Sequence, residues 1–185
     1  MREPLRGRLL VATPDLEDPN FFRTVVLVLE HSDEGSLGVV LNRPTTAAAL
    51  AGALPAWAPL VDEPAVLFVG GPVQPDAAIG LARRGEPGEP DGFAPLFDDL
   101  GPVDLQREPD EVRPRLDRLR VFAGYAGWGP GQLESELDAN GWFVVHADPA
   151  DPWTGTPEDL WRGVLRRQPG KARLFADFPL DARMN

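Results

Sequence analysis

The stretch that decides the fold is Thr24-Val-Val-Leu-Val-Leu-Glu-His-Ser-Asp-Glu-Gly-Ser-Leu-Gly-Val-Val-Leu41, near the N-terminus. Residues 24–30 are β-branched and almost continuously apolar, which predicts a strand that is buried on both faces. Residues 37–41 have the same character, and the polar connection His31–Gly35 between the two runs predicts a hairpin with a longer loop. We therefore expect a fold organised around an antiparallel strand pair.

Further along the chain, the same signals predict more strands and a few short helices. Apolar runs of strand length are found at residues 9–12, 65–69, 77–83, 119–123 and 142–147. Helical patterns are found at residues 47–60, which two prolines interrupt, at 132–139 and at 156–167. The proline-rich residues 85–111 are expected to be mostly irregular, with one short strand near Val103. Because strands dominate and 185 residues suit one core, we expect a single α+β domain over residues 1–185, with a mixed or mostly antiparallel sheet.

The composition excludes several classes of protein. Without cysteine the chain can have no disulfide, no thiol nucleophile and no zinc–thiolate site, and this fits a reducing cytoplasm. The N-terminal residues lack an apolar run of signal-peptide length, and the longest such run, residues 25–29, is far short of the roughly 20 residues that span a bilayer. We therefore expect a soluble, cytoplasmic protein without a membrane partner.

The charge of the chain bears on its partners. Acidic residues outnumber basic ones 29 to 18, giving a formal net charge of −11, and duplex DNA repels such a chain unless its basic residues are segregated. Two local exceptions are the arginine-rich residues 113–120 and 162–173. A solvated face is the more common meaning of a charge run, and neither segment contains interleaved aromatic residues, so nucleic acid is disfavoured as a partner.

The glycine-rich segment Gly124-Tyr-Ala-Gly-Trp-Gly-Pro-Gly131 is the most informative motif. It follows a predicted strand and precedes a helix predicted to begin at Gln132, where free backbone N–H groups could face an anion. The segment lacks the lysine and the serine or threonine of a phosphate-binding loop, and Glu134 already places negative charge in the first helical turn. A structural turn from strand to helix is therefore favoured over an anion site.

Two shorter motifs contain candidate binding groups. Asn42-Arg43-Pro44 follows a predicted strand and places a guanidinium, which can hold a carboxylate or phosphate through two hydrogen bonds, beside an amide. The alternative for Arg43 is an internal ion pair with a carboxylate such as Glu134, and this role is slightly favoured. Gly70-Gly71-Pro72 ends another strand tightly and offers a second place where backbone can approach a ligand.

Signals for catalytic chemistry are sparse. The serines and histidines of the chain are Ser32, Ser36, Ser135, His31 and His146. No serine lies in a GxSxG motif, so a serine triad is strongly disfavoured. Glu134 and Asp138 share a helical face, but a solvated acidic surface explains them better than a metal site does. We expect no metal and no cofactor, and no residue is assigned a catalytic role.

Taken together, the motifs resemble those of the YqgE/AlgH family, most of whose members have no known function. The shared segments, in chain order, are Gly7–Pro14, Asp18–Phe21, His31–Pro44, Val69–Val73 and Gly124–Glu136, followed by Trp142. They extend over essentially the whole chain, although residues 85–109 are the least family-like. The resemblance implies one α+β domain whose sheets fold into a partly closed, barrel-like arrangement with helices packed outside.

The resemblance also implies that the signature positions converge on one surface. The candidate ligand-binding residues are Asn42, Arg43, Gly70, Gly71, Trp128, Gly129, Gln132, Glu134 and Glu136. We expect a non-catalytic binding or regulatory module with a cleft for a small anionic ligand or a protein partner, in which Arg43 contacts the negative group. Trp128 and Gln132 are expected to form a wall of the same hollow.

Two alternatives belong to other functional classes. One is an uncharacterised enzyme that uses Glu134 or Glu136 as a general base or cation ligand, which would require burial to raise the pKa of the carboxyl group. The other is a transcriptional regulator, a label that some family members carry. Direct DNA binding is disfavoured by the net charge of −11.

Overall fold

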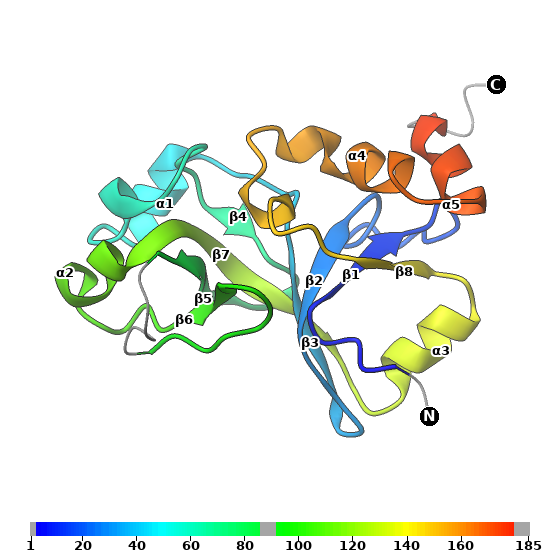
Figure 1. The fold of residues 1–185 in the computed structure, drawn as a ribbon, viewed down its shortest axis with the longest axis horizontal. Coiled ribbons are helices and arrows are strands. Elements are labelled where there is room, and N and C mark those ends of the chain that lie inside the picture. Colours follow the sequence, from blue (N-terminus) through cyan, green and yellow to red (C-terminus); the bar gives the residue numbers. More distant parts are fainter. Residues whose placement is uncertain (1–2, 86–91, 180–185) are drawn as a thin grey trace.

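The computed structural model describes residues 3–85 and 92–179, which form one twisted sheet with short helices around it (Figure 1). The strands of these residues are β1 (Arg8–Ala12), β2 (Val25–Ser32), β3 (Gly35–Val40), β4 (Phe68–Val69), β5 (Val73–Arg84), β6 (Leu100–Val103), β7 (Leu116–Trp128) and β8 (Trp142–His146). The α-helices are α1 (Ala47–Ala53), α2 (Pro109–Val112), α3 (Gln132–Asp138), α4 (Leu160–Arg166) and α5 (Lys171–Leu174). The α+β prediction is confirmed.

The sheet has eight strands within the described residues, in the order β6-β5-β7-β3-β2-β1-β8, with β4 beside β7. Every pairing is antiparallel except that of β4 with β7. The long strand β7 joins two halves: its residues 116–125 pair with β5, and its residues 126–128 pair with β3. The edge strands β6 and β8 do not pair with each other, so the sheet is not closed, in agreement with the expected partly closed arrangement.

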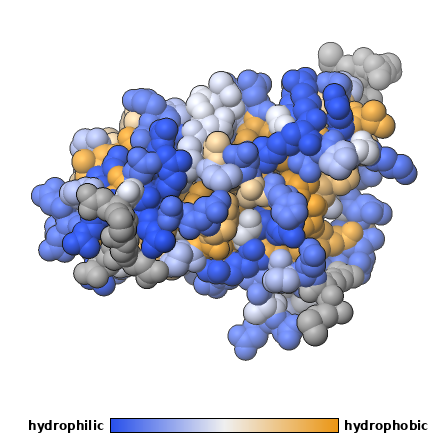
Figure 2. Space-filling model, in the orientation of Figure 1, coloured by the Kyte–Doolittle hydropathy of each residue, from blue (hydrophilic) through white to orange (hydrophobic). Residues whose placement is uncertain are grey.

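Strand β2 is covered on both faces, as its apolar run predicts. On one face, Val25 and Leu27 belong to a core that includes buried residues of α4. On the other, Val26 and Val28 pack in a core with Leu133 of α3 and two buried tryptophans. Hydrophilic side chains cover most of the visible face of the molecule (Figure 2). No helix of the described residues is long and apolar enough to cross a membrane.

Three local predictions were wrong. The hairpin connection is only Asp33–Glu34, because Ser32 already pairs with Gly35. The strand predicted at residues 65–69 is limited to β4, Phe68–Val69. The carbonyl of the preceding residue, Leu67, accepts a hydrogen bond from the N–H of Thr45, which does not belong to a strand. The glycine-rich segment is not a loop from Gly124 onward, because β7 continues to Trp128 by pairing with β3.

Other boundaries agree more closely with the sequence. Helix α3 ends at Asp138, and Asn140 just beyond its C-cap has a left-handed φ of 59°, as the Asn140-Gly141 pair predicts. The short strand expected near Val103 is β6. The predicted helix at residues 156–167 begins as a 3₁₀ turn at Pro157–Asp159, and Thr156 makes no side-chain capping bond. Residues 86–91 of the proline-rich segment lie outside the described residues.

Candidate functional site

The carboxylate of Glu136 fastens helix α3 to the sheet. Its Oε2 atom accepts a hydrogen bond from the indole Nε1 of Trp128 at 2.9 Å and from that of Trp142 at 2.8 Å. Both tryptophans are at most 5% exposed, and Phe21 stacks on the first and meets the second edge-on. Because an ionised carboxylate only accepts hydrogen bonds, Glu136 is well suited to join the two indoles.

Gln132 and Gly129 belong to the same network. Gln132 Nε2 donates to Glu136 Oε1 at 3.3 Å, and Gln132 Oε1 accepts the backbone N–H of Gly129 at 3.0 Å. This N–H is therefore occupied within the protein. The segment that leads into α3 works as a structural turn, and Trp128 with Gln132 forms part of a packed unit.

A row of side chains crosses the sheet beside this unit. His31 on β2 is opposite Ser36 on β3, and Ser36 is opposite Trp128 on β7, so the three side chains project from one face. His31 Nδ1 lies 2.7 Å from Ser36 Oγ, and His31 Nε2 lies 3.6 Å from Glu134 Oε1. Serine, histidine and an acid in contact are the residue types of a nucleophile, its base and an orienting group. In the serine-protease arrangement, however, the serine contacts Nε2 of the histidine.

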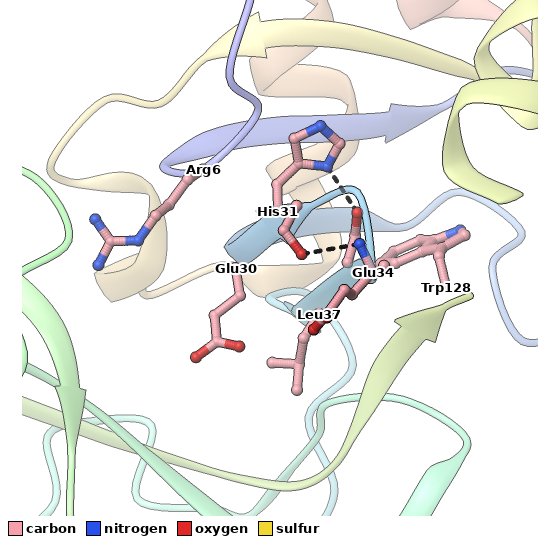
Figure 3. Close-up of a pocket in the computed structure, with 9 residues that line it drawn as sticks. Arg6, Glu30, His31, Glu34, Leu37 and Trp128 are labelled. Atoms are coloured by element: carbon pink, nitrogen blue, oxygen red, sulfur yellow. Dashed lines mark hydrogen bonds between the residues drawn. The ribbon is translucent and has the colours of Figure 1, made fainter. Parts of the chain in front are cut away.

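His31, Ser36 and Trp128 line a cleft of about 490 Å³ (Figure 3). Arg6 and Trp128 stand at opposite ends of the cleft in this view, with His31 between them. The lining also includes Glu30 and Glu34, whose two carboxylates outnumber the one guanidinium. The volume is that of a small-molecule site, but these charges disfavour an anion.

Arg43 lies just beyond the other end of β3. Its Nη2 donates hydrogen bonds to the carbonyl oxygens of Pro19 at 3.0 Å and Phe22 at 3.1 Å. Burial lowers the pKa of Arg43, and the negative charge of Asp18 partly opposes this shift. The predicted ion pair with Glu134 is wrong, since the carboxylate that acts on Arg43 is that of Asp18.

A small hollow of about 50 Å³ adjoins this guanidinium. It is lined by Asn20, Val40, Arg43, Val69, Gly71 and Pro72. One water needs roughly 10–15 Å³ by such a measure, so the hollow admits a group of a few heavy atoms, such as a carboxylate. Asn42 holds the adjacent backbone in place, because its Oδ1 accepts the N–H of Val25 at 2.9 Å and its Nδ2 donates to the carbonyl of Arg23 at 2.8 Å.

Gly70 and Gly71 are in close contact with the backbone of β7. A Cβ atom on Gly71 would lie 2.1 Å from the carbonyl carbon of Tyr125, and one on Gly70 would lie 2.3 Å from the carbonyl oxygen of Gly124. The 70–71 segment therefore continues alongside β7, parallel to it, at a distance that excludes any side chain. These glycines therefore allow the backbone of β7 to come close, and this contact within the protein is their first role.

The candidate residues divide between two places. Around α3, next to the large cleft, lie Trp128, Gly129, Gln132, Glu134 and Glu136. Around the small hollow lie Asn42, Arg43, Gly70 and Gly71. Ser36, which is opposite Trp128, lies at the start of β3, whereas Arg43 lies beyond its end at Val40, and the two hollows share no lining residue. The expectation of a single shared hollow is therefore corrected to two separate ones.

Comparison with known proteins identifies the family. The sequence profile described as AlgH-like matches residues 9–173. The chain belongs to the AlgH-like family. It is 52% identical to a UPF0301 protein of Streptomyces coelicolor, covering 98% of this chain and 95% of that one, and 46% identical to a UPF0301 protein of Mycobacterium leprae, covering 97% and 90%. The resemblance inferred from the motifs is confirmed.

Two solved structures have the same fold. The crystal structure of a Corynebacterium diphtheriae protein matches with a TM-score of 0.88 at 35% identity, covering 96% of this chain and 94% of that one. The solution structure of AlgH from Pseudomonas aeruginosa matches with a TM-score of 0.71 at 28% identity, covering 98% and 100%.

Some residues around the two hollows of this AlgH-like chain were not predicted from the sequence. Asp18 and Asn20 beside Arg43 belong to a segment shared with the family but were not among the candidate binding residues, and neither was Arg6 at the large cleft. The contact of His31 with Ser36 was also missed, although a two-residue hairpin turn places these positions opposite each other. In residues 3–85 and 92–179, no group of three or more His, Asp or Glu side chains is placed to hold a metal ion.

Proposed function

We propose that this AlgH-like chain is a non-catalytic binding module that holds the carboxylate of a small organic anion in the hollow beside Arg43. The observation that carries the proposal is a partly buried guanidinium that lines an open space of carboxylate size. Burial lowers the pKa of Arg43, which means that the charged guanidinium is incompletely solvated. An anion that enters the hollow would stabilise this charge.

The donors and the lining favour a carboxylate with a short apolar tail. Both hydrogen bonds of the Arg43 side chain to the described residues come from Nη2, which leaves Nη1 and Nε for a ligand. Val40, Val69 and Pro72 add apolar surface to the hollow. Asp18 weakens the attraction, so free acids should bind modestly. An acidic side chain of a protein partner has the same chemistry and would use the same contact.

An NMR titration with sodium formate and sodium butyrate, at constant ionic strength, tests this function. We expect saturable shifts of the Gly71 amide and the Arg43 side-chain signals. Butyrate should bind several-fold more tightly than formate, because each buried CH₂ contributes about 0.8 kcal/mol. Arg43→Gln should abolish the response, whereas Arg115→Gln, which removes an exposed arginine elsewhere, should preserve it. Equal shifts in Arg43→Gln, or shifts that never saturate, would contradict the proposal.

A hydrolytic or acyl-transfer function is the second candidate, and the contact of Ser36 with His31 favours it. Of the two acids considered as catalytic groups, Glu134 adjoins this pair, whereas Glu136 holds the tryptophans. Ser36 is 8% exposed but lines the cleft of Figure 3. This candidate requires that a bound electrophile can reach the hydroxyl group.

A fluorophosphonate probe tests the second candidate. Attack by Ser36 Oγ would form an oxygen–phosphorus bond, expel fluoride and transfer the hydroxyl proton to His31 Nδ1. This function predicts an adduct on Ser36 by mass spectrometry, lost in His31→Ala, which keeps the serine, and retained in the Ser135→Ala control. An unlabelled Ser36 under conditions that label a serine hydrolase would eliminate this candidate.

A further inference from the structure

A third hollow, of about 440 Å³, lies where β5 and β7 meet the loop that precedes α4. Its lining includes Arg83 of β5, Arg118 of β7, Trp153 of the loop and Arg167 just after α4, together with two carboxylates, those of Asp148 and Asp151, so that three guanidiniums outnumber two carboxylates. The short 3₁₀ turn Asp151–Trp153 contacts β7, and Figure 1 shows this loop beside β7 in the middle of the molecule. The hollow shares no lining residue with the two described above.

The hollow brings like charges together. Arg83 and Arg118 are directly opposite each other in the antiparallel register of β5 and β7. Opposed residues project from the same face of a sheet, and like charges in this position destabilise it. Arg167 adds a third guanidinium, so the arginine-rich segments 113–120 and 162–173 meet here. In a chain with a net charge of −11, composition does not explain this concentration of positive charge.

The carboxylates of the protein neutralise these arginines only in part. Both terminal nitrogens of Arg167 are occupied, because they donate hydrogen bonds to Asp151 at 2.6 and 2.5 Å. This pairing raises the pKa of Arg167. Arg83 donates from both Nε and Nη2 to Asp117, which lies outside the lining, so within the described residues its Nη1 is the atom left for a ligand. Arg118 approaches Asp62 only to 3.7 Å, which is longer than a hydrogen bond, and its side chain is 45% exposed. Arg118 is therefore the group from which a ligand can gain most, and Arg83 can add one donor.

An independent observation concerns Trp153. Its indole Nε1 is buried and has no hydrogen-bond partner among the described residues. Nearly all buried polar groups in proteins are paired, and this N–H has almost no accessible surface although Trp153 itself lines the hollow, so an acceptor from outside the chain, a water or a ligand atom, would satisfy it once the loop admits one. The arginines thus favour an anion, and the indole N–H favours a ligand that carries a second acceptor atom.

We propose that this hollow binds a phosphate-bearing small molecule about the size of a nucleoside monophosphate, with Arg83 and Arg118 on the phosphate and the Trp153 indole N–H on a second acceptor. Two neighbouring guanidiniums suit the charge and geometry of a phosphate dianion. The volume lies within the range of small-molecule sites. This site is independent of the hollow beside Arg43, so either can fail without the other.

Calorimetric titration and NMR with inorganic phosphate and AMP test the proposal. We expect AMP to bind saturably and more tightly than inorganic phosphate, which lacks the second acceptor. The Trp153 indole N–H signal, assigned with Trp153→Phe, should move downfield with AMP. Arg118→Gln, which alters an exposed side chain, should weaken binding by about tenfold or more through the loss of charged hydrogen bonds. Arg173→Gln, an exposed arginine outside the hollow, is the matched control and should bind as the wild type does.

Four results would overturn the proposal. The first is equal AMP affinity of Arg118→Gln and the wild type, and the second is an equal loss in Arg173→Gln, which would mean attraction by overall charge. The third is an indole signal of Trp153 that does not move at saturation. Retardation of duplex DNA at low salt that Arg118→Gln abolishes would instead assign the arginines to nucleic acid and would also overturn it.

Discussion

Replacement of Gly71 by alanine is expected to lower the free energy of unfolding by about 4 kcal/mol or more, which is among the largest effects of single substitutions. The added Cβ would lie 2.1 Å from the carbonyl carbon and 2.2 Å from the carbonyl oxygen of Tyr125. Both atoms belong to the backbone of β7, so no side-chain rotation relieves the overlap. Chemical denaturation of the wild type and the variant, followed by circular dichroism, measures the difference.

Gly163→Ala is the matched control for this prediction. Gly163 is exposed within α4, and a Cβ there would have no neighbour within 4 Å. Alanine in a helix is more favourable than glycine by about 0.5–1 kcal/mol, so this variant should be slightly more stable than the wild type. A Gly71→Ala protein as stable as the wild type would show that the 70–71 segment does not lie against the backbone of β7 as described.

The second large effect is expected for Glu136→Ala. This change leaves the buried indole N–H groups of Trp128 and Trp142 without their shared acceptor, at a cost of about 1–3 kcal/mol for each unpaired donor. We expect a total loss of about 3 kcal/mol, which corresponds to a decrease in Tm of about 6–12 °C for a chain of this length. Differential scanning calorimetry measures the decrease, and tryptophan fluorescence should report the altered environment of the two rings.

Two further variants separate this role from a general effect of charge. Glu136→Gln keeps a carbonyl oxygen as acceptor and should lose only about 1 kcal/mol, the net value of a typical hydrogen bond. Glu17→Ala removes the same charge from an exposed loop position and should be neutral. If Glu136→Ala lowered the stability no more than Glu17→Ala does, Glu136 would not fasten α3 to the sheet. The alternative role of Glu136 as a general base or cation ligand would then be favoured again.

The sequence predicts those parts of the fold whose signals are local. The apolar run 24–30 predicts that β2 is buried on both faces, because its odd-numbered and even-numbered residues are both apolar and point to opposite sides of the sheet. Asn140 predicts the end of α3, because a left-handed residue suits a helix terminus. The end of β7 could not be predicted in this way. Gly124 has the left-handed φ of a turn, yet the strand continues because β3 pairs with it, and that pairing depends on residues far away in the sequence.

For the candidate site, the sequence identified residues that do line hollows, but it did not predict which of them lie together. Arg43 and Gly71 do line one hollow, as expected from their motifs. Trp128 and Gln132 were assigned to the same hollow, but the strand register places them at the opposite end of β3. Register is a long-range property, and here it also brings Arg83 against Arg118 and His31 against Ser36. The first pair joins residues far apart in the sequence that carry no mutual signal, whereas the second is local and follows from the length of the hairpin turn.

The anomalous scattering of crystals soaked in sodium bromide tests the anion site beside Arg43 most directly. We predict a bromide peak in the hollow lined by Arg43 and Gly71 in the wild type, and no such peak in crystals of Arg43→Gln. Bromide bound elsewhere on the wild-type protein, with none beside Arg43 although solvent reaches the hollow, would contradict the proposed function.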